Sequence, residues 1–345
     1  MRVKLYPILV FCVVLLFEAC QKKDVVLSTT ANEVFWVTNH GADMPVWVKG
    51  NTASKVIILV VHGGPATGSY NFSDYETASL RKKYGVAFWD QRDAGSSSGN
   101  DNIGELSLPQ MANDLNAVVK VLKYRYHNPS IFLYAHSFGG LVAAAYLETG
   151  NYQNDLKGWM EIDGAHNYPL TNSESKNALI DTGTAQIALG RHVSEWQEIV
   201  NYCKTHNPRK SFDASSQIEV YAHDAEAYMG IVPSTVNNQV FSPEDPSSLL
   251  VNYVKIFYTP GGSHFITSLQ NLNYSKGMDA IKIPSLLLWG KYDFTVPASV
   301  GDDALKHLGS AYKKLIIYPH SGHRPMQGDT EALEDDMISF VEQFK

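Results

Sequence analysis

The chain has 345 residues, of which 44% are hydrophobic and 18% are charged. These proportions are those of an ordinary globular protein, and they supply enough apolar residues for one large α/β domain or two small ones. The formal net charge of -7, without a cluster of basic residues, argues against binding to nucleic acid.

The first residues have the pattern of an export signal. Two basic residues, Arg2 and Lys4, precede a short apolar run over residues 8–17. The run is too short to span a bilayer comfortably, and it resembles the apolar part of a secretory signal peptide. Because Cys20 follows, with the polar residues 21–24 after it, the segment is similar to a bacterial lipoprotein signal.

That resemblance implies cleavage before Cys20 and a lipid on this new N-terminus; a plain signal peptide and an uncleaved anchor are the alternatives. We therefore expect a signal peptide over residues 1–19 and a tether over 20–32. The folded domain is then exported to the bacterial cell envelope, outside the cytoplasm, and its only membrane contact is the N-terminal lipid. Since Cys12 lies in the signal, Cys203 has no disulfide partner, and we expect a packed thiol there.

The following part of the chain alternates between strands and helices. β-Branched and aromatic runs bounded by turn residues predict strands, whereas apolar residues at helical spacing predict helices. Strands are predicted at residues 34–37, 46–48, 55–61, 86–89, 131–134 and 158–162. The first two strands form a hairpin, and a long helix is predicted from Leu108. This alternation predicts an α/β fold with a mostly parallel sheet covered by helices.

The alternation stops in the middle of the chain and resumes in its last quarter. Residues 170–275 are polar, aromatic and helix-like without buried strand patterns, so we expect a helical cap inserted into the sheet domain. Two more strands are predicted at 283–290 and 314–318, before a final amphipathic helix. The sheet domain is thus expected to consist of residues 33–169 and 276–345.

One serine lies at a sharp turn. The strand at 131–134 turns at Ser137 and continues as the Ala-rich helix of residues 141–147. Such a turn exposes the serine hydroxyl above the N-terminus of the helix, where negative charge is stabilised. The nucleophile-elbow pattern is G-x-S-x-G, and Ala135 replaces its first glycine, where a small residue suffices. The alternative is a buried serine that caps an ordinary helix.

A serine hydroxyl is a poor nucleophile unless a base accepts its proton and a carboxylate orients that base. Asp293 and His323 each follow a predicted strand, as Ser137 does. Open α/β sheets place ligands at the carboxyl ends of their strands, so these three residues are the candidate nucleophile, acid and base. Asp163 is the alternative acid, and His320 is the alternative base.

The negative oxygen of a tetrahedral intermediate needs two N–H donors. Phe138, directly after the serine, offers one, and Gly64 is the candidate for the other because a turn without side chains lets the backbone approach a substrate. An ordinary tight turn at Gly64 is the alternative. No cofactor is expected, and no metal site either, because His320 and His323 lack companions at ligand spacing.

Three motifs in sequence order carry a resemblance to a known family. They are His62-Gly63-Gly64-Pro65, then Asp90-Gln91-Arg92 with Gly95 and Ser97, and Ala135-His136-Ser137-Phe138-Gly139-Gly140. With them the chain resembles the α/β-hydrolase superfamily, closest to its prolyl iminopeptidase branch, over about residues 30–170 and 280–345. The resemblance implies the α/β-hydrolase fold with a helical cap, a triad of Ser137, Asp293 and His323, and an oxyanion hole at Gly64 and Phe138.

Iminopeptidases hold the free amino group of the substrate with acidic cap residues. Glu195, Glu198 and Glu226 could do so here, but we expect them to be solvated helix surface. The sequence therefore predicts a serine hydrolase that cleaves an ester or amide bond of a small-molecule or short-peptide substrate through an acyl-enzyme. The alternatives are an aminopeptidase similar to the prolyl iminopeptidases and a non-catalytic surface lipoprotein that binds a ligand.

Overall fold

A computed structural model describes residues 30–69, 77–99, 104–231 and 248–345. The signal peptide at 1–19, the lipid anchor at Cys20 and the tether up to residue 29 lie outside these ranges and stay predictions. None of the described helices is both long enough and apolar enough to cross a membrane.

The described strands form one eight-stranded sheet with the order β1-β2-β4-β3-β5-β6-β7-β8. Their bounds are β1 (Thr30–Asn39), β2 (Ala42–Asn51), β3 (Val56–Val61), β4 (Gly85–Trp89), β5 (Ser130–His136), β6 (Gly158–Ile162), β7 (Ser285–Gly290) and β8 (Lys313–Tyr318). The pairs β1–β2 and β2–β4 are antiparallel, and the other pairs are parallel. This confirms the mostly parallel sheet predicted from the alternation of strands and helices.

The predicted tether is three residues too long. It extends to residue 32, but β1 begins at Thr30, which pairs with Asn51 at the end of β2. Thr30, Ala31 and Asn32 carry no strand pattern in the sequence. At the edge of a sheet, backbone hydrogen bonds to one neighbour can extend a strand without a run of large apolar residues. Here Thr30 and Asn32 are exposed, and the small Ala31 is partly buried against the core.

Hydrophobic cores lie on both faces of the sheet, and the buried strand β3 contributes side chains to each of them. Ile57, Leu59 and Val61 belong to one hydrophobic core, whereas Ile58 and Val60 belong to the other. Since successive side chains of a strand point to opposite faces, both sets must be apolar. The continuous apolar run that predicted this strand is therefore a direct consequence of burial on both sides.

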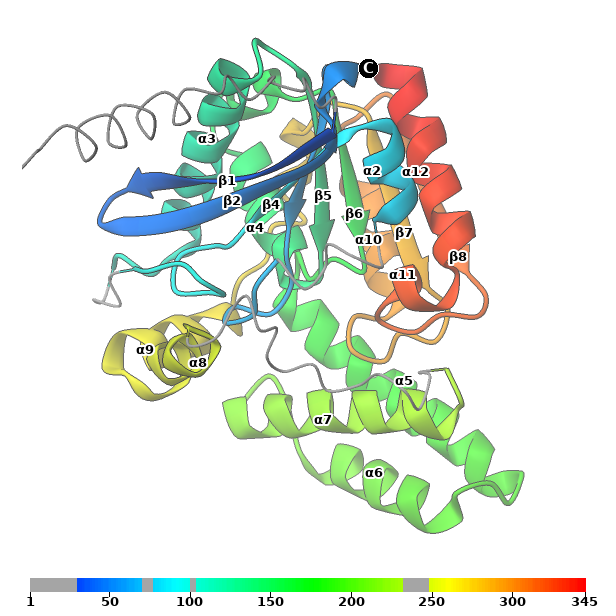
Figure 1. Cartoon of the computed structure of the whole chain (residues 1–345). Helices are drawn as coiled ribbons and strands as arrows, with labels where there is room; N and C mark the ends of the chain where they lie inside the picture. Colours follow the sequence, from blue (N-terminus) through cyan, green and yellow to red (C-terminus); the bar gives the residue numbers. More distant parts are fainter. Residues whose placement is uncertain (1–29, 70–76, 100–103, 232–247) are drawn as a thin grey trace, which may run out of the picture.

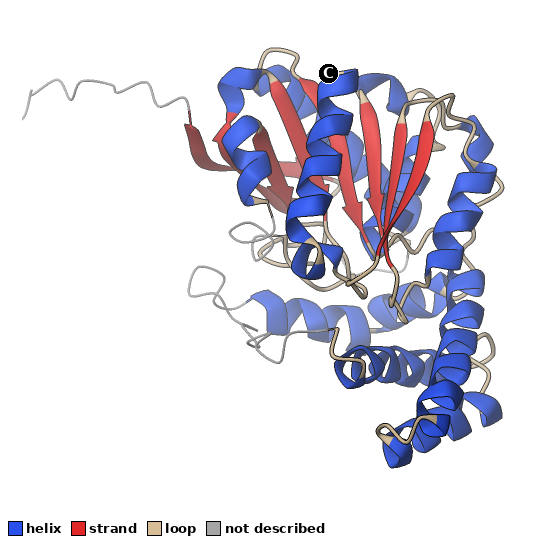
Figure 2. Ribbon diagram, turned by 90° about the vertical axis from the view of Figure 1, so that its right-hand side faces the viewer, coloured by secondary structure: helices blue, strands red, loops and turns tan. Residues whose placement is uncertain are grey.

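Helices cover both faces of the sheet (Figures 1 and 2). The helices α3 (Leu108–Arg125), α4 (Phe138–Leu147) and α10 (Ala298–His307) contribute to one core, and α2 (Ala78–Lys83), α11 (Pro325–Gly328) and α12 (Thr330–Phe344) contribute to the other. These layers leave the carboxyl edge of the parallel strands as the place where loops from different strands meet.

Between β6 and β7 the described chain forms α5 (Tyr168–Ala188), α6 (Val193–Thr205), α7 (Phe212–Tyr228), α8 (Ser248–Tyr258) and α9 (Pro260–Leu269). We call these helices the cap; Figure 1 shows them below the carboxyl edge of the sheet. Helices α5, α6 and α7 share a hydrophobic core that contains Trp196, the predicted packed thiol Cys203, and Phe294 from the loop after β7.

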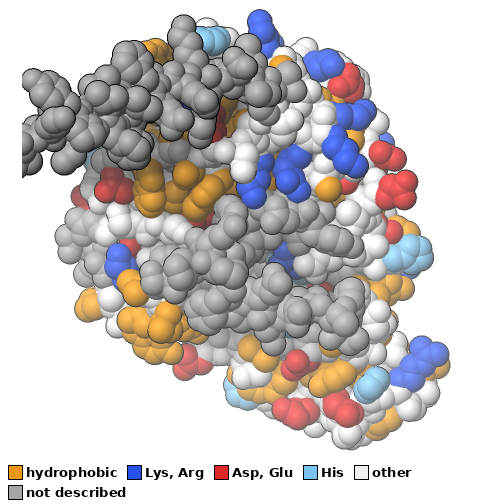
Figure 3. Space-filling model, viewed as in Figure 1, with side chains coloured by type: hydrophobic (Ala, Val, Ile, Leu, Met, Phe, Trp, Pro, Cys, Tyr) orange, Lys and Arg blue, Asp and Glu red, His pale blue; other side chains and the backbone are white. Residues whose placement is uncertain are grey.

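Helix α8 is bound to the sheet domain by polar side chains. The amide of Asn252 donates to the carbonyl of Gly95 at 2.7 Å, and Lys255 pairs with Asp93 at 3.1 Å. On the outer side of the helix, apolar side chains are exposed and gather over α8 and α9 in Figure 3; they include Leu250, Val251, Val254 and Tyr258. The helix therefore docks through specific polar contacts, with Ile256 as its buried apolar residue.

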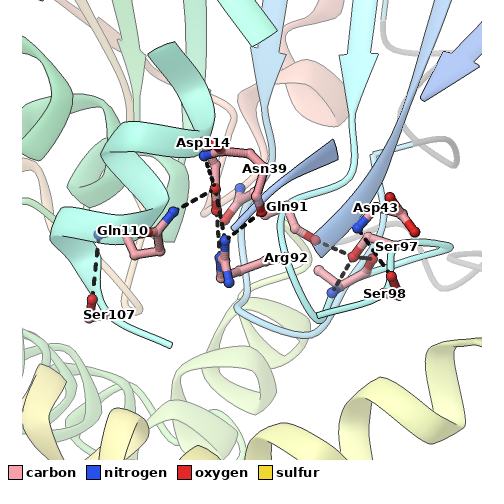
Figure 4. A network of polar contacts seen from close by, with 10 residues as sticks. Asn39, Asp43, Gln91, Arg92, Ser97, Ser98, Ser107, Gln110 and Asp114 are labelled. Atoms are coloured by element: carbon pink, nitrogen blue, oxygen red, sulfur yellow. Dashed lines mark hydrogen bonds and ion pairs between the residues drawn. The ribbon is translucent and has the colours of Figure 1, made fainter. Parts of the chain in front are cut away.

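A buried ion pair joins the loop after β4 to α3, and the hairpin of β1 and β2 contacts this pair through Asn39 (Figure 4). The guanidinium of Arg92 binds the carboxylate of Asp114 on α3 through two hydrogen bonds of 2.5 and 2.9 Å. The same carboxylate accepts from Asn39 at 2.8 Å and from Gln110 at 2.9 Å. Burying two charges is unfavourable unless hydrogen bonds offset the loss of water. Asp114 accepts from three side chains, whereas Nη1 of Arg92 has no hydrogen-bond partner among the described residues.

A second buried charge network lies below the turn after β6. The ring of His166 contacts Glu161 at 3.0 Å and Asp303 of α10 at 3.3 Å, and Ser275 donates to the same oxygen of Asp303. Burial alone would lower the pKa of His166, but the two carboxylates outweigh it and raise that pKa to about 9. The imidazolium therefore links β6, α10 and the segment before β7.

We predict that this network makes stability depend on pH above neutrality. Because the folded pKa of His166 is about 9 against an ordinary 6.5, its contribution is complete below pH 6.5 and is lost as the pH rises through 9. The shift corresponds to on the order of 3 kcal/mol of unfolding free energy. Urea unfolding of the wild type between pH 6 and pH 9.5 should show this loss, and His166→Gln should weaken the dependence.

The exposed His264 of α9 offers a matched control, because its variant His264→Gln should keep the wild-type dependence. Wild-type stability that stays constant across this pH range would contradict a charged His166.

Candidate active site

Ser137 lies between the end of β5 and the start of α4, in a backbone conformation that few side chains adopt. Its φ is 55° and its ψ is -123°. The N–H of Ser137 donates to the carbonyl of Ile162 at 3.0 Å, and the carbonyl of Ser137 accepts from the N–H of Ala165 at 3.0 Å. The end of β6 and the turn after it thus hold a conformation that costs about 1–3 kcal/mol.

Two glycines after the serine allow helix α4 to approach the strands closely. A Cβ on Gly139 would lie 2.1 Å from the carbonyl oxygen of Val61, and one on Gly140 would lie 2.7 Å from the Cα of Gly164. Both distances are too short for any side chain. The small residues of the elbow motif are therefore required by contact between backbones.

The structure brings Ser137, Asp293 and His323 together. Nε2 of His323 is 2.9 Å from Oγ of Ser137, and Nδ1 is 2.8 Å from Oδ2 of Asp293. The other oxygen of Asp293 accepts the backbone N–H groups of Thr295 and Val296, both at 2.8 Å. Asp293 accepts a hydrogen bond from Nδ1 of His323, so the imidazole carries its proton on Nδ1. Its Nε2 is then free to accept the proton of the serine hydroxyl.

The base of this arrangement is neutral at neutral pH. Burial, and then the nearby His223 and Arg324, hold the pKa of His323 well below its usual value. A neutral imidazole next to a serine hydroxyl can act as a general base.

Asp163, the alternative acid, lies beside Asp293. It is fully buried, and its Oδ1 accepts the N–H of Gly290 at 2.9 Å. Burial, and then the charge of Asp293, raise the pKa of Asp163 well above its usual value. Burial also raises the pKa of Asp293, to about 8, but the N–H groups of Val296 and Thr295 and a hydrogen bond from Asp163 lower it. Of the two acids, Asp293 is therefore the one whose negative charge is stabilised, and we assign the proton between them to Asp163.

His320, the alternative base, points elsewhere. It is exposed, and its backbone N–H donates to Asp329 at 3.1 Å. The next residue, Ser321, is bound to the same carboxylate at 2.6 Å, and the carbonyl of His323 is 2.9 Å from Nε2 of His136. These contacts fix the loop after β8 so that it carries His323 to the serine.

The two candidate oxyanion donors lie next to Ser137. Phe138 is the first residue of α4, and Gly64, with a φ of 51°, follows Gly63, whose added Cβ would lie 2.9 Å from the Cβ of Ser137. Within the described residues, no hydrogen bond uses the backbone N–H of Gly64 or of Phe138. Both groups are thus available to an anion at the serine.

The turn at Gly64 is fixed by Gln91. Its backbone N–H donates to Nε2 of His62 at 3.2 Å, and its side-chain amide donates to the carbonyl of His62 at 2.8 Å. Burial lowers the pKa of His62 to about 4, so the ring is neutral and can accept this bond. The middle residue of the Asp90-Gln91-Arg92 motif thus holds the turn directly.

A small cavity of about 70 Å³ reaches Ser137 among the described residues. Its wall consists of Ser137, Ala165, Tyr168, Thr171, Asn172, Ser175, Ser215, Ile218, Glu219, Thr295 and Val296. The acidic member, Glu219 of α7, was not selected from the sequence. Burial raises its pKa, yet its side chain remains accessible to solvent, as expected for a group in a cavity wall.

Of the three cap acids considered from the sequence, Glu226 is not solvated surface, and that expectation is wrong. It is 3% exposed, and its carboxylate accepts the backbone N–H of His323 at 3.0 Å. Helix α7 packs its Glu226 face against the loop after β8, a tertiary contact that the helix pattern alone does not reveal. Glu195 is partly exposed on α6, and Glu198 accepts from Tyr221 at an exposed site.

His136, Asp163 and His323 each place one nitrogen or oxygen within 4.8 Å of the others. Such a group could in principle hold a metal ion. However, both ring nitrogens of His323 are hydrogen-bonded, to Ser137 and to Asp293. A metal ion bound there would have to break one of these two bonds.

Comparison with known proteins identifies the family. Residues 56–326 match the model of a protein family whose description is "alpha/beta hydrolase fold". The chain belongs to the α/β-hydrolase family. This confirms the predicted fold class and the resemblance, and it identifies the protein as a hydrolase.

The α/β-hydrolase relatives include peptidases and esterases. The probable aminopeptidase YbaC of Bacillus subtilis (strain 168) is 20% identical over 288 residues, covering 81% of this chain and 86% of the relative. The proline iminopeptidase of Saccharolobus solfataricus (strain ATCC 35092 / DSM 1617 / JCM 11322 / P2) is 21% identical over 304 residues, covering 86% and 87%. The esterase EaEST from Exiguobacterium antarcticum shares the fold with a TM-score of 0.57, 18% identity and coverage of 89% and 98%.

We predict that the two neighbouring aspartates differ in their effect on hydrolysis. Asp293→Asn should lower kcat by about 10⁴, because an amide at this position favours the wrong tautomer of His323. Asp163→Asn should lower it less than about 10-fold, because an amide can still donate to Asp293 and accept from Gly290. Steady-state kinetics of both variants tests this, and a larger loss for Asp163→Asn would reverse the assignment.

Proposed function

We propose that this hydrolase cleaves an ester or amide bond of a small substrate through an acyl-enzyme. The observation that carries the proposal is the continuous hydrogen-bonded series from Ser137 through His323 to Asp293, with distances of 2.9 and 2.8 Å. A neutral buried imidazole between a serine hydroxyl and a carboxylate is the arrangement that activates serine as a nucleophile.

In the proposed reaction, Oγ of Ser137 attacks the carbonyl carbon of the substrate while Nε2 of His323 takes the hydroxyl proton. Asp293 stabilises the imidazolium, and the N–H groups of Gly64 and Phe138 hold the negative oxygen of the tetrahedral intermediate. His323 then gives its proton to the leaving alcohol or amine. Water attacks the acyl-serine through the same base and releases the acid and free Ser137.

The cavity at Ser137 supports a small acyl group. It has a volume of only about 70 Å³. Hydroxyl and amide groups from α5 and α7 line it, so a polar acyl group would find hydrogen-bond partners there.

A second candidate, an aminopeptidase, is favoured by one specific observation. Glu219 lies in the wall of the same cavity as Ser137, where its carboxylate could bind the free amino group of an N-terminal residue. Similarity to a probable aminopeptidase and to a proline iminopeptidase supports this candidate. In this case the acyl group would be an aminoacyl group.

The first test of the proposed function is Ser137→Ala. Removing the nucleophile should lower kcat for a short-chain aryl ester by on the order of 10⁶. A fluorophosphonate probe should label the wild type at this serine and leave the variant unlabelled. A purified, folded wild type that neither turns over esters or arylamides nor reacts with the probe would instead favour a ligand-binding protein without catalysis.

The second test separates the two substrate classes. If Glu219 binds an ammonium group, Glu219→Gln should lower kcat/KM for aminoacyl arylamides by about 10–100-fold, the value of a hydrogen bond between charged groups. The same variant should change kcat/KM for a neutral aryl ester less than about 3-fold. Equal losses on both substrates, or no loss on either, would exclude the amino-binding assignment.

A further inference from the structure

Phe294, the residue directly after Asp293, is embedded in the cap. Its carbonyl accepts from Ser175 of α5 at 2.6 Å, and its ring packs edge-on against Trp196 of α6 at 6.4 Å between centroids. Its backbone N–H faces the carboxylate of Glu226 on α7 closely enough to lower the pKa of this acid. Three cap helices therefore hold the loop that carries the acid of the proposed triad.

The loop that carries the base meets the same carboxylate. Glu226 accepts the N–H of His323 at 3.0 Å. A Cβ on the preceding Gly322 would lie 2.3 Å from the other carboxylate oxygen, so only a glycine leaves room for Glu226. One cap side chain thus contacts both loops, although they follow different strands.

Keeping a carboxylate at this place is unfavourable by itself. Glu226 is 3% exposed, and burial and then the nearby Asp293 raise its pKa to about 8. A buried acid next to another acid is tolerated only if its hydrogen bonds are satisfied. The backbone N–H of His323 provides such a bond, and the N–H of Phe294 also lowers the pKa of Glu226.

We propose that Glu226 is a positioning residue, which fastens the loops of Asp293 and His323 to the cap so that the imidazole is held in line with Ser137. This inference rests on the proposed function. It implies that the cap takes part in aligning the groups that react, in addition to forming one wall of the cavity.

The proposal has a kinetic signature. Glu226 is not among the residues that line the cavity at Ser137, so its replacement leaves the wall that would face the acyl group unchanged. A displacement of about 1 Å at a reacting group can cost 10²-fold in rate. Loss of the contact should therefore appear in kcat, with little change in KM.

The experiment compares Glu226→Ala and Glu226→Gln with the wild type on a neutral short-chain aryl ester, which carries no amino group. Glu226→Ala should lower kcat about 30–100-fold with KM changed less than about 3-fold. Glu226→Gln keeps one acceptor oxygen and should recover part of the loss, with kcat reduced about 3–10-fold. Glu195→Ala, at a partly exposed cap position on α6, should match the wild type.

Thermal unfolding of each variant checks that it is folded, and if Glu226→Ala does not fold, Glu226→Gln decides alone. A folded variant with wild-type kcat, or with a loss confined to KM, overturns the proposal. A wild type that is itself inactive and unlabelled by the fluorophosphonate refutes the proposed function instead. An active wild type with a fully active Glu226→Ala refutes only the positioning by Glu226.

Discussion

The backbone of Ser137 is strained because the polypeptide must leave β5 and enter α4 without room for an ordinary turn. Hydrogen bonds to the end of β6 and to the turn after it hold the strain on both sides of the serine. The close contact between Gly139 and the carbonyl of Val61, at the end of β3, restricts the start of α4 from a third direction. The hydroxyl position is therefore set by three neighbouring strands, and the other groups of the site need only be brought to a fixed point.

Charge is the second constraint at this point. Asp163, Asp293 and Glu226 are all buried near one imidazole, and like charges in such a place cannot all be ionised. The hydrogen bonds decide which acid keeps its charge: Asp293 accepts two backbone N–H groups and faces Nδ1 of His323. With Asp163 as a neutral donor, the site keeps a negative charge where an imidazolium would form.

Local sequence signals predicted the sheet and the chain order of the site residues. A strand buried on both faces, such as β3, must be apolar throughout, and the elbow needs its small residues, so both are visible in the sequence. Glu219 and Glu226 were missed or misread because they are seven residues apart on α7, on one helix face, and nothing local tells whether that face meets solvent. The burial of Glu226, and the place of Glu219 in the cavity wall, depend on loops that follow β7 and β8, far along the chain.

The position at which the cap is inserted explains why its contacts reach the loop of Asp293. The chain leaves the sheet after Asp163, begins α5 at Tyr168, and returns only before β7, whose following loop carries Asp293. Phe294 then packs back into the core of α5, α6 and α7. The cap thus begins shortly after Asp163 and is held in place beside Asp293. A movement of the cap as a rigid unit would therefore strain the loops on which Asp293 and His323 depend.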